Sequence, residues 1–448
     1  MAAKPSLINR IVYSFELFEQ VLARGGTLTI VVALLALSWL NSPWGASWLY
    51  LWDTPLTITF GTYSIAKPIG FWVQQVLLAL FYMVLGLELK RVLRVGELKE
   101  RPDMLFAIAA AFGGMAIPAG LYLYLAPLAA QAGWPVVVTA DASAVLALLA
   151  LASNSLPLPL RVFLSSSAIM QGIASLLLSV LLYTAIQNLL ALSIATGVFG
   201  LLVVLRALRN RTMWLYLLLG LVMLVSFLLA GVQGAVAGVL LALVTPIHSR
   251  VNEEDFVTTT DTVMGQLHAL RMMKRPEPDE EIEEDFQAAA HTLRINCTKA
   301  LSPLRRLQQR LLPWAAYLAL PLFALAFVPF AYNSFAWRDL LGPVPLGIFM
   351  ALVLGKPLGM LLFAWLASLT GIARKPATVH WGQLTGGTLL VSAGFMLSLF
   401  QAQQVFAATE QLTLVKISIY AASAVAGLLG LLVLAMAGKT KDLPHTQV

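Results

Sequence analysis

Residues 133–143 read GWPVVVTADAS and place an acidic side chain, Asp141, in the middle of an apolar run. A charge inside a membrane span costs roughly 3 kcal/mol or more unless it is paired or hydrated. A proline followed by several polar side chains is typical of a locally unwound helix, whose oxygens can bind a small hard cation. We therefore interpret Thr139, Asp141 and Ser143 as candidates for an ion and proton site. The alternative is an aspartate that only caps half of a helix.

The composition sets the class of protein. The chain has 448 residues, of which 59% are apolar and only 11% charged, with a mean hydropathy of +0.82. Soluble domains average about 25% charged residues, so a soluble protein is excluded. The single cysteine, Cys297, excludes a disulfide scaffold. The net charge of +7 indicates cytoplasmic loops of a membrane protein, and we expect no nucleic-acid partner.

We predict an all-α polytopic membrane protein in which residues 1–448 form one transmembrane domain. At about 20 residues per span, the apolar runs predict about twelve helices. They lie near 26–46, 72–92, 103–125, 135–152, 160–184, 187–205, 212–229, 232–245, 314–332, 343–369, 382–402 and 412–437. An even number of spans puts both termini on one side of the membrane.

The cations predict which side that is. They follow the even-numbered spans, whereas residues 126–135 and 184–188 contain none. Lysine and arginine accumulate in cytoplasmic loops, so both termini are predicted to be cytoplasmic. The cations after the even-numbered spans include Lys90, Arg91, Arg94, Arg206, Arg209, Arg211, Arg374, Lys375, Lys439 and Lys441.

Three segments lie outside the predicted spans. Residues 1–25 have the apolar spacing of an amphipathic helix on the membrane surface. Residues 55–65 alternate β-formers around a glycine, which predicts an extracytoplasmic β-hairpin or an ordinary loop. Residues 250–312 form an acidic cytoplasmic insertion between the eighth and ninth spans, carrying 11 of the 22 acidic residues. This insertion is interpreted as a solvated linker, or as a segment that binds a cytoplasmic partner through residues 253–285.

Two further charged positions lie in apolar surroundings. Lys356 stands inside the tenth span, where an ammonium group has to pair with a carboxylate, meet the C-terminus of a half-helix or lose its proton. Glu88 and Arg91 mark the cytoplasmic end of the second span, as a structural salt bridge or a pH-sensing cluster.

A second interrupted span is indicated by Gly386, Gly387, Ser392 and Gly394. Broken helices in both halves of a chain point to an inverted-repeat secondary transporter. The sequence has no P-loop, no His/Cys metal cluster and no nucleophile motif, so we expect no enzyme activity, no cofactor and no bound metal.

With these residues in view, the chain resembles the NhaA family of bacterial Na+/H+ antiporters. The matching stretches include VLGLELKR (84–91), PLPLRVFL (157–164), LGIFMALVLGKPLG (346–359) and GFMLSLF (394–400), in family order. The resemblance implies inverted repeats with crossed discontinuous helices, and a homodimer helped by the hairpin. It also implies a location in the lipid of the bacterial inner membrane and exchange of Na+ or Li+ for H+.

The same resemblance indicates that several ionisable residues of the family are replaced in this chain. The family's adjacent aspartate pair falls at Gln171 and Gly172, and a family acid of the second span falls at Gln75. The family histidine of the Gly-Val-His motif falls at Gln233, and residues 308–310 read Gln-Gln-Arg. Asp141, Lys356, Glu88 and Arg91 are retained.

Three functions remain open at the level of sequence. In the first, the chain is an antiporter that works by alternating access with Asp141 as the surviving ion and proton site. Lys356 would be its charge partner or a second proton carrier, and Gln171 would supply an oxygen. In the second, the same fold moves another solute, such as an anion held by Lys356. In the third, a non-transporting scaffold or sensor acts through residues 253–285.

Overall fold

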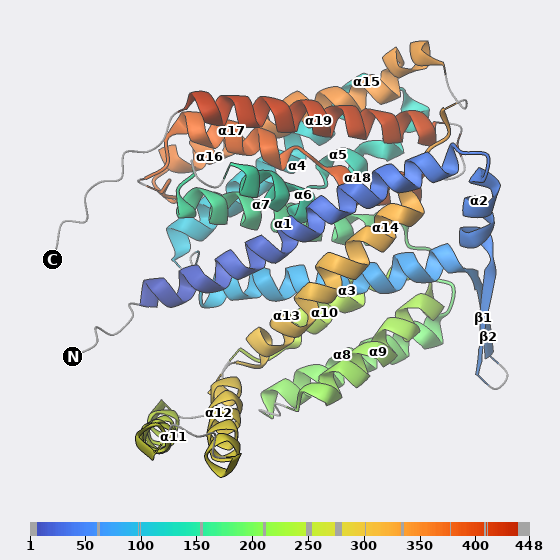
Figure 1. The fold of residues 1–448 in the computed structure, drawn as a ribbon. Coiled ribbons are helices and arrows are strands. Elements are labelled where there is room, and N and C mark those ends of the chain that lie inside the picture. The colour runs from blue at the N-terminus through green and yellow to red at the C-terminus, as the bar shows by residue number, and fades with distance from the viewer. Residues whose placement is uncertain are drawn as a thin grey trace.

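The computed structural model of the chain is mostly helical (Figure 1). It describes residues 7–437 except for a set of short gaps. These are 61–62, 97, 99, 153–155, 209–211, 248–252, 274–279, 301, 333–335, 377, 407–408 and 410.

Among the described residues, eight helices are long and apolar enough to cross a membrane, or ten if each of two bent pairs is one span. Six of them are uninterrupted α-helices: α1 (Leu7–Leu40), α4 (Arg101–Leu125), α7 (Leu158–Tyr183), α8 (Leu189–Ala207), α9 (Met213–Ala230) and α19 (Leu412–Met436). Many large apolar side chains point outward, including Leu34, Leu181 and Leu428, as a lipid-facing surface requires. The predicted helical, multi-pass membrane protein is confirmed.

Two spans contain a π-helical turn followed by a proline. In one, α13 (Pro303–Trp314) continues through Ala315–Ala319 into α14 (Leu320–Phe327). In the other, α15 (Pro343–Met350) continues through Ala351–Gly355 into α16 (Lys356–Leu369). Proline has no N–H for the carbonyl four residues earlier, and a wider turn accommodates that loss. The second turn ends directly before Lys356.

The two bent pairs lie at the centre of the molecule. A short 3₁₀ turn, η1 (Leu128–Gly133), leads into α5 (Trp134–Val138), which is followed by α6 (Ala142–Leu151) at a bend of 52°. In the second half of the chain, α17 (Trp381–Val391) is followed by α18 (Phe395–Phe406) at 43°. Both predicted interruptions are therefore breaks between helices. Beside them, α3 (Ile69–Arg94) packs along the short α10 (Gly234–Val244).

A two-stranded sheet follows the short helix α2 (Gly45–Asp53). Strands β1 (Pro55–Phe60) and β2 (Tyr63–Pro68) are antiparallel, in register from Pro55 opposite Pro68 to Phe60 opposite Tyr63. They stand away from the helices in Figure 1. The side of the membrane on which they lie stays a prediction.

Two predicted boundaries differ from the structure. The first is the N-terminal segment 1–25, which is not a separate surface helix, because α1 runs through this boundary and buries Phe15, Phe18 and Leu22. Helix α1 is held there by Glu19, whose carboxylate accepts a hydrogen bond of 2.5 Å from Arg161 of α7. Residues 1–6 lie outside the described part.

The second boundary concerns the acidic insertion. Its described residues form α11 (Glu253–Met273) and α12 (Glu280–Ala300), which pack on each other. Residues 303–312 belong to α13 instead, because Ser302 caps that helix by accepting a hydrogen bond from Arg305 N at 3.3 Å. Residues 250–252, 274–279 and 301 of the insertion are outside the described part.

We predict that α4 and α16 tolerate no side chain where they cross. A Cβ atom at Gly113 would collide with Gly359 O, and a Cβ atom at Gly359 would collide with Gly113 O. Overpacking costs about 2 kcal/mol, so Gly113→Ala should lower the thermal unfolding midpoint of the purified protein by several degrees. Gly120→Ala on the same helix has open space around it and is the matched control. Equal midpoints for the two variants would contradict the packing argument.

Candidate ion-binding site

The α5–α6 break positions Asp141 as the N-cap of α6. Helix α5 ends at Val138, and Thr139 continues in an extended conformation. Asp141 Oδ1 accepts hydrogen bonds from Ser143 N at 2.9 Å, Ser143 Oγ at 2.6 Å and Ala144 N at 3.4 Å. The side chain is completely buried. The capping role that the sequence offered as an alternative is therefore present at the candidate ion site.

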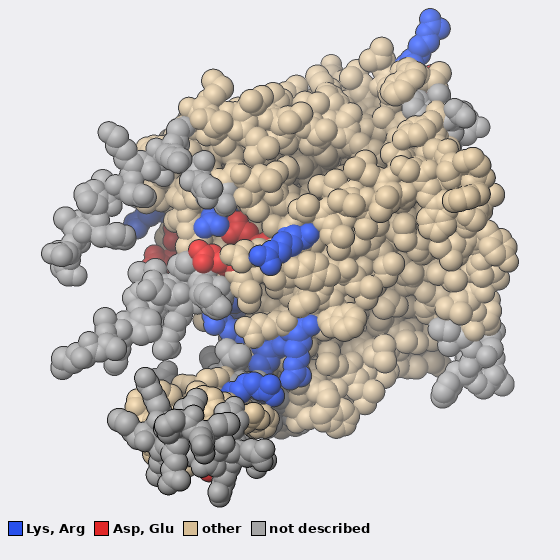
Figure 2. Space-filling view, in the orientation of Figure 1, with Lys and Arg blue, Asp and Glu red and all other residues tan. Residues whose placement is uncertain are grey.

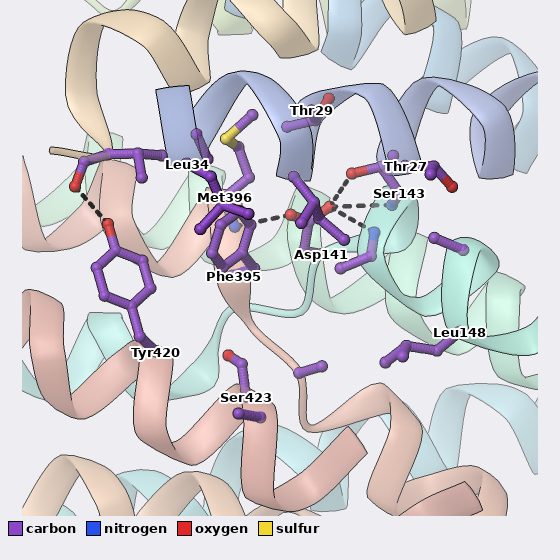
Figure 3. A pocket seen from close by; sticks show the side chains of 18 of the residues that line it. Thr27, Thr29, Leu34, Asp141, Ser143, Leu148, Phe395, Met396, Tyr420 and Ser423 are labelled. Atoms are coloured by element: carbon purple, nitrogen blue, oxygen red, sulfur yellow. Dashed lines mark hydrogen bonds between the residues drawn. The ribbon is translucent and has the colours of Figure 1, made fainter. Parts of the chain in front are cut away.

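The other oxygen of the same carboxylate reaches the second broken pair. Asp141 Oδ2 accepts a hydrogen bond of 2.8 Å from Met396 N, in the first turn of α18 (Figure 3). One carboxylate thus satisfies backbone donors at the N-termini of two half-helices from opposite halves of the chain. Such termini carry a partial positive charge, which stabilises a carboxylate between them.

Lys356 provides the complementary charge. Its Nζ donates a hydrogen bond to Thr139 O, at the C-terminal end of α5, and the side chain is completely buried. The carbonyls at that end carry a partial negative charge. The ammonium group therefore meets the end of a half-helix, which is one of the three environments expected from the sequence.

A cavity of about 620 Å³ lies beside Asp141. Its walls come from α1, α6, α18 and α19, and the side chains on them are mostly apolar. Figure 3 shows Thr27 and Thr29 of α1 on the same side of the cavity as Asp141 and Ser143. Within the described residues, no group of three His, Cys, Asp or Glu side chains could hold a metal ion.

Comparison with known proteins places this arrangement in a family. The family described as Na+/H+ antiporter 1 matches residues 17–434. The chain belongs to this antiporter family. The Na(+)/H(+) antiporter NhaA of Koribacter versatilis is 34% identical over 434 residues, covering 97% of this chain and 93% of the relative. The NhaA protein of Oleidesulfovibrio alaskensis is 34% identical over 426 residues, covering 95% and 94%. The predicted family resemblance is confirmed.

Gln171 and Gly172, which the resemblance aligns with the family's aspartate pair, lie on α7, and Gly172 approaches the α5–α6 break. A Cβ atom on Gly172 would lie 3.2 Å from Ala140 O, inside that break. Gln171 is completely buried and points its Nε2 atom toward Met360 Sδ at 3.6 Å, while its Oε1 atom has no hydrogen-bond partner in the described part. The resemblance predicted that both residues belong to the ion site. The structure places Gly172 next to the break that carries Asp141.

The second broken span is interrupted at only two of the four predicted positions. Ser392 and Gly394 lie in the α17–α18 break, but Gly386 and Gly387 lie inside α17. Both glycines leave room for a neighbouring leucine side chain. A Cβ atom on Gly386 would lie 2.7 Å from Leu434, and one on Gly387 would lie 2.5 Å from Leu164. Their role is close packing, since the α-helical hydrogen bonds continue through them.

Gln75 contributes to another helix terminus. Its Oε1 atom accepts a hydrogen bond of 2.7 Å from Gly234 N, at the start of α10, beside the N-cap residue Gln233. A neutral amide therefore occupies a helix N-terminus at the position that the resemblance aligns with a family acid. This position is separate from the hydrogen bonds of Asp141.

Glu88 and Arg91 form a buried ion pair at the end of α3. Arg91 Nη2 and Nε donate to the carboxylate at 2.7 and 2.9 Å, and Gln308 of α13 donates a third hydrogen bond at 2.5 Å. The neighbouring Lys90, one of the cations that the sequence places on the cytoplasmic side, donates to the Ala242, Leu243 and Thr245 carbonyls at the C-terminus of α10. A lysine near a helix end is too common a sequence feature to have predicted this contact.

Removing one member of the ion pair should destabilise the protein. Arg91→Ala leaves Glu88 buried without its guanidinium partner, which costs about 3 kcal/mol. Arg94→Ala, one turn later on α3 and exposed, is the matched control. Guanidinium or thermal unfolding in detergent should separate the two variants, and similar stabilities would show that the pair is dispensable.

Proposed function

We propose that this chain exchanges Na+ or Li+ for H+ across the bacterial inner membrane by alternating access, with Asp141 as the ion and proton site. The observation that carries the proposal is the carboxylate of Asp141, buried at the crossing of two broken helices and bonded to both. The family membership and the printed names of the relatives support the same activity.

The chemistry around Asp141 suits a small hard cation. Carboxylate, hydroxyl and carbonyl oxygens are the ligands that such cations prefer. Asp141 and Ser143 supply the first two kinds, and Thr139 supplies a hydroxyl and a carbonyl. Gln171 Oε1, a buried oxygen without a donor, is the further ligand that we propose.

The movements of Na+ and H+ are coupled because the two ions compete for one carboxylate. A buried carboxylate that loses its Na+ is stabilised by taking up a proton, because an uncompensated charge there is costly. Protonation in turn removes the charge that attracts Na+. Lys356, at the opposite half-helix terminus, balances this charge or carries a second proton.

The architecture supports a twelve-crossing arrangement. We propose twelve crossings, by counting α3 and the short α10 with the eight apolar helices and the two bent pairs. We propose that the two halves form inverted repeats crossing at Asp141. Figure 2 shows Lys and Arg gathered near α11 and α12, and the positive-inside rule makes that end cytoplasmic. The strands β1 and β2 then face the opposite side, where we propose that they pair two copies of the chain.

The anion alternative has less support. Lys356 Nζ already donates to Thr139 O, and an anion placed there would approach a carbonyl oxygen and the carboxylate of Asp141. For α11 and α12 the two alternatives from the sequence stand as proposals: a solvated linker, or a segment that binds a cytoplasmic partner through residues 253–285.

Antiport is tested in liposomes that contain a pH-sensitive dye and an imposed proton gradient. Addition of Na+ or Li+ should drive proton movement in the wild type and in Asp339→Asn, a carboxylate variant in an exposed turn. Asp141→Asn should fall below a tenth of that rate, since it keeps the shape of the side chain but cannot exchange a proton. Full transport by Asp141→Asn would eliminate this residue as the site, and no response of the wild type would overturn antiport.

Restoring a carboxylate at Gln171 should strengthen Na+ binding. Gln171→Asp places a second negative charge near Lys356 and should lower the Na+ concentration for half-maximal transport by about tenfold, equivalent to about 1.4 kcal/mol. Gln171→Asn controls for the shorter side chain. An unchanged Na+ dependence in the aspartate variant would show that Gln171 does not contact the ion.

A further inference from the structure

The cavity beside Asp141 opens on the apolar surface of the molecule. Three of the side chains that line it, Ile30, Leu34 and Leu151, are 51%, 60% and 76% exposed. Helix α1 packs on α6 along one side of the cavity, and α19 packs on α18 along the other. In Figure 1, α6 and α18 lie between α1 and α19. The cavity is therefore in contact with the hydrocarbon layer that surrounds these spans.

The walls of the cavity favour an apolar occupant. Four of the five hydroxyl-bearing side chains on them already donate a hydrogen bond within the protein, namely Thr27, Thr29, Ser143 and Tyr420. The fifth hydroxyl, Ser423 Oγ, has no partner in the described part of the chain. A buried water molecule makes about three hydrogen bonds to polar groups, so these walls do not hold a water cluster. The volume of about 620 Å³ falls in the range of about 300–1,000 Å³ that ligand sites have.

A cation stands at one end of the cavity. Arg24 lies three residues before Thr27, on the same face of α1 and within the span Phe15–Leu40. Its side chain is exposed, and no carboxylate in the described part of the chain pairs with it. A guanidinium group inside a span is costly unless it reaches the polar surface of the membrane or an anion.

The acidic side chains that precede Arg24 on α1 are paired with another cation. Arg161 of α7 contacts the carboxylate of Glu19 at 2.5 Å and that of Glu16 at 4.0 Å. The charge of Arg24 is therefore left for an anion from outside the chain. A phosphate group suits it, because a guanidinium can bind two phosphate oxygens through parallel hydrogen bonds.

We propose that this cavity is a phospholipid site, with an acyl chain in the cavity and the lipid phosphate at Arg24. A phospholipid joins the two groups that the site needs, a long hydrocarbon chain and an anion. The lipid comes from the leaflet at the N-terminal end of α1, which the positive-inside rule makes cytoplasmic. This inference goes beyond the proposed transport function and does not depend on it.

The bound acyl chain forms part of the surroundings of Asp141. Asp141 and Met396, which are joined by a hydrogen bond, both line the cavity. A hydrocarbon chain on this side excludes water from the carboxylate, and hydrogen bonds are electrostatically stronger where water is absent. The lipid therefore supports the contact between α6 and α18 from the membrane side.

Native mass spectrometry of the full chain in detergent tests the site, because it counts the lipids on the intact protein. The delipidated protein is titrated with palmitoyl-oleoyl phosphatidylglycerol. A parallel titration uses the diacylglycerol with the same two chains and no phosphate. We expect the diacylglycerol to bind to this site about fivefold more weakly, as the loss of one charged contact implies.

Two variants separate this site from other lipid contacts. Arg24→Gln removes the cation, and Ala424→Phe fills the cavity from an exposed position on α19. Arg338→Gln, at another exposed arginine, is the control for charge. Gly197→Phe, at an exposed position of α8 with open space around it, is the control for size. Arg24→Lys keeps the positive charge at the site.

We expect Arg24→Gln and Ala424→Phe each to bind one phosphatidylglycerol fewer than the wild type at saturation, and Arg24→Lys and both controls to bind the same number. Equal numbers in all variants would overturn the site. A loss in only one of the two variants would also overturn it, because the phosphate and the chain belong to one lipid. If Ala424→Phe instead converts a dimer to a monomer, a second copy of the chain fills the cavity and the lipid assignment is wrong. The lipid count does not require Na+/H+ exchange, so it is read independently of the liposome assay.

Discussion

The hydrogen bonds of the Asp141 carboxylate to α6 and to Met396 of α18 hold the centre of this molecule together. Each broken span exposes backbone groups that a continuous helix would satisfy internally, and in a membrane there is little water to replace them. A single carboxylate satisfies donors from both breaks and so fixes where the two halves of the chain cross. Because that carboxylate also exchanges a proton or an ion in the proposed function, occupancy of the site and the position of the half-helices are physically linked.

Lys356 completes the electrostatic balance at the crossing. The π-helical turn before Pro357 precedes this side chain, which meets the carbonyl end of α5. Gln75 and Gln308, which the resemblance aligns with ionisable residues of the family, make hydrogen bonds to Gly234 N and to Glu88. These amides keep the helix-end contacts without a charge, and the proposed function leaves proton exchange to Asp141 and Lys356.

Neutral polar side chains also meet between α7 and α18, away from the site. Hydroxyls and amides can be buried without the desolvation cost of a charge, provided that they are hydrogen-bonded. Ser179 and Gln401 contact each other directly across the two helices.

The sequence by itself determined the membrane class, the two interrupted spans and the candidates Asp141 and Lys356, because a charge in an apolar run is rare and costly wherever the chain folds. The boundaries predicted after residues 25 and 312 differ from the structure, since apolar periodicity indicates neither helix caps nor tertiary burial. Only the tertiary structure decided that Asp141 accepts a hydrogen bond from Met396 N. Nearly every residue has a backbone N–H, so the sequence does not indicate which one a carboxylate will bind. It alone decided that Ser179 meets Gln401, because a contact across 222 residues depends on how the two halves pack.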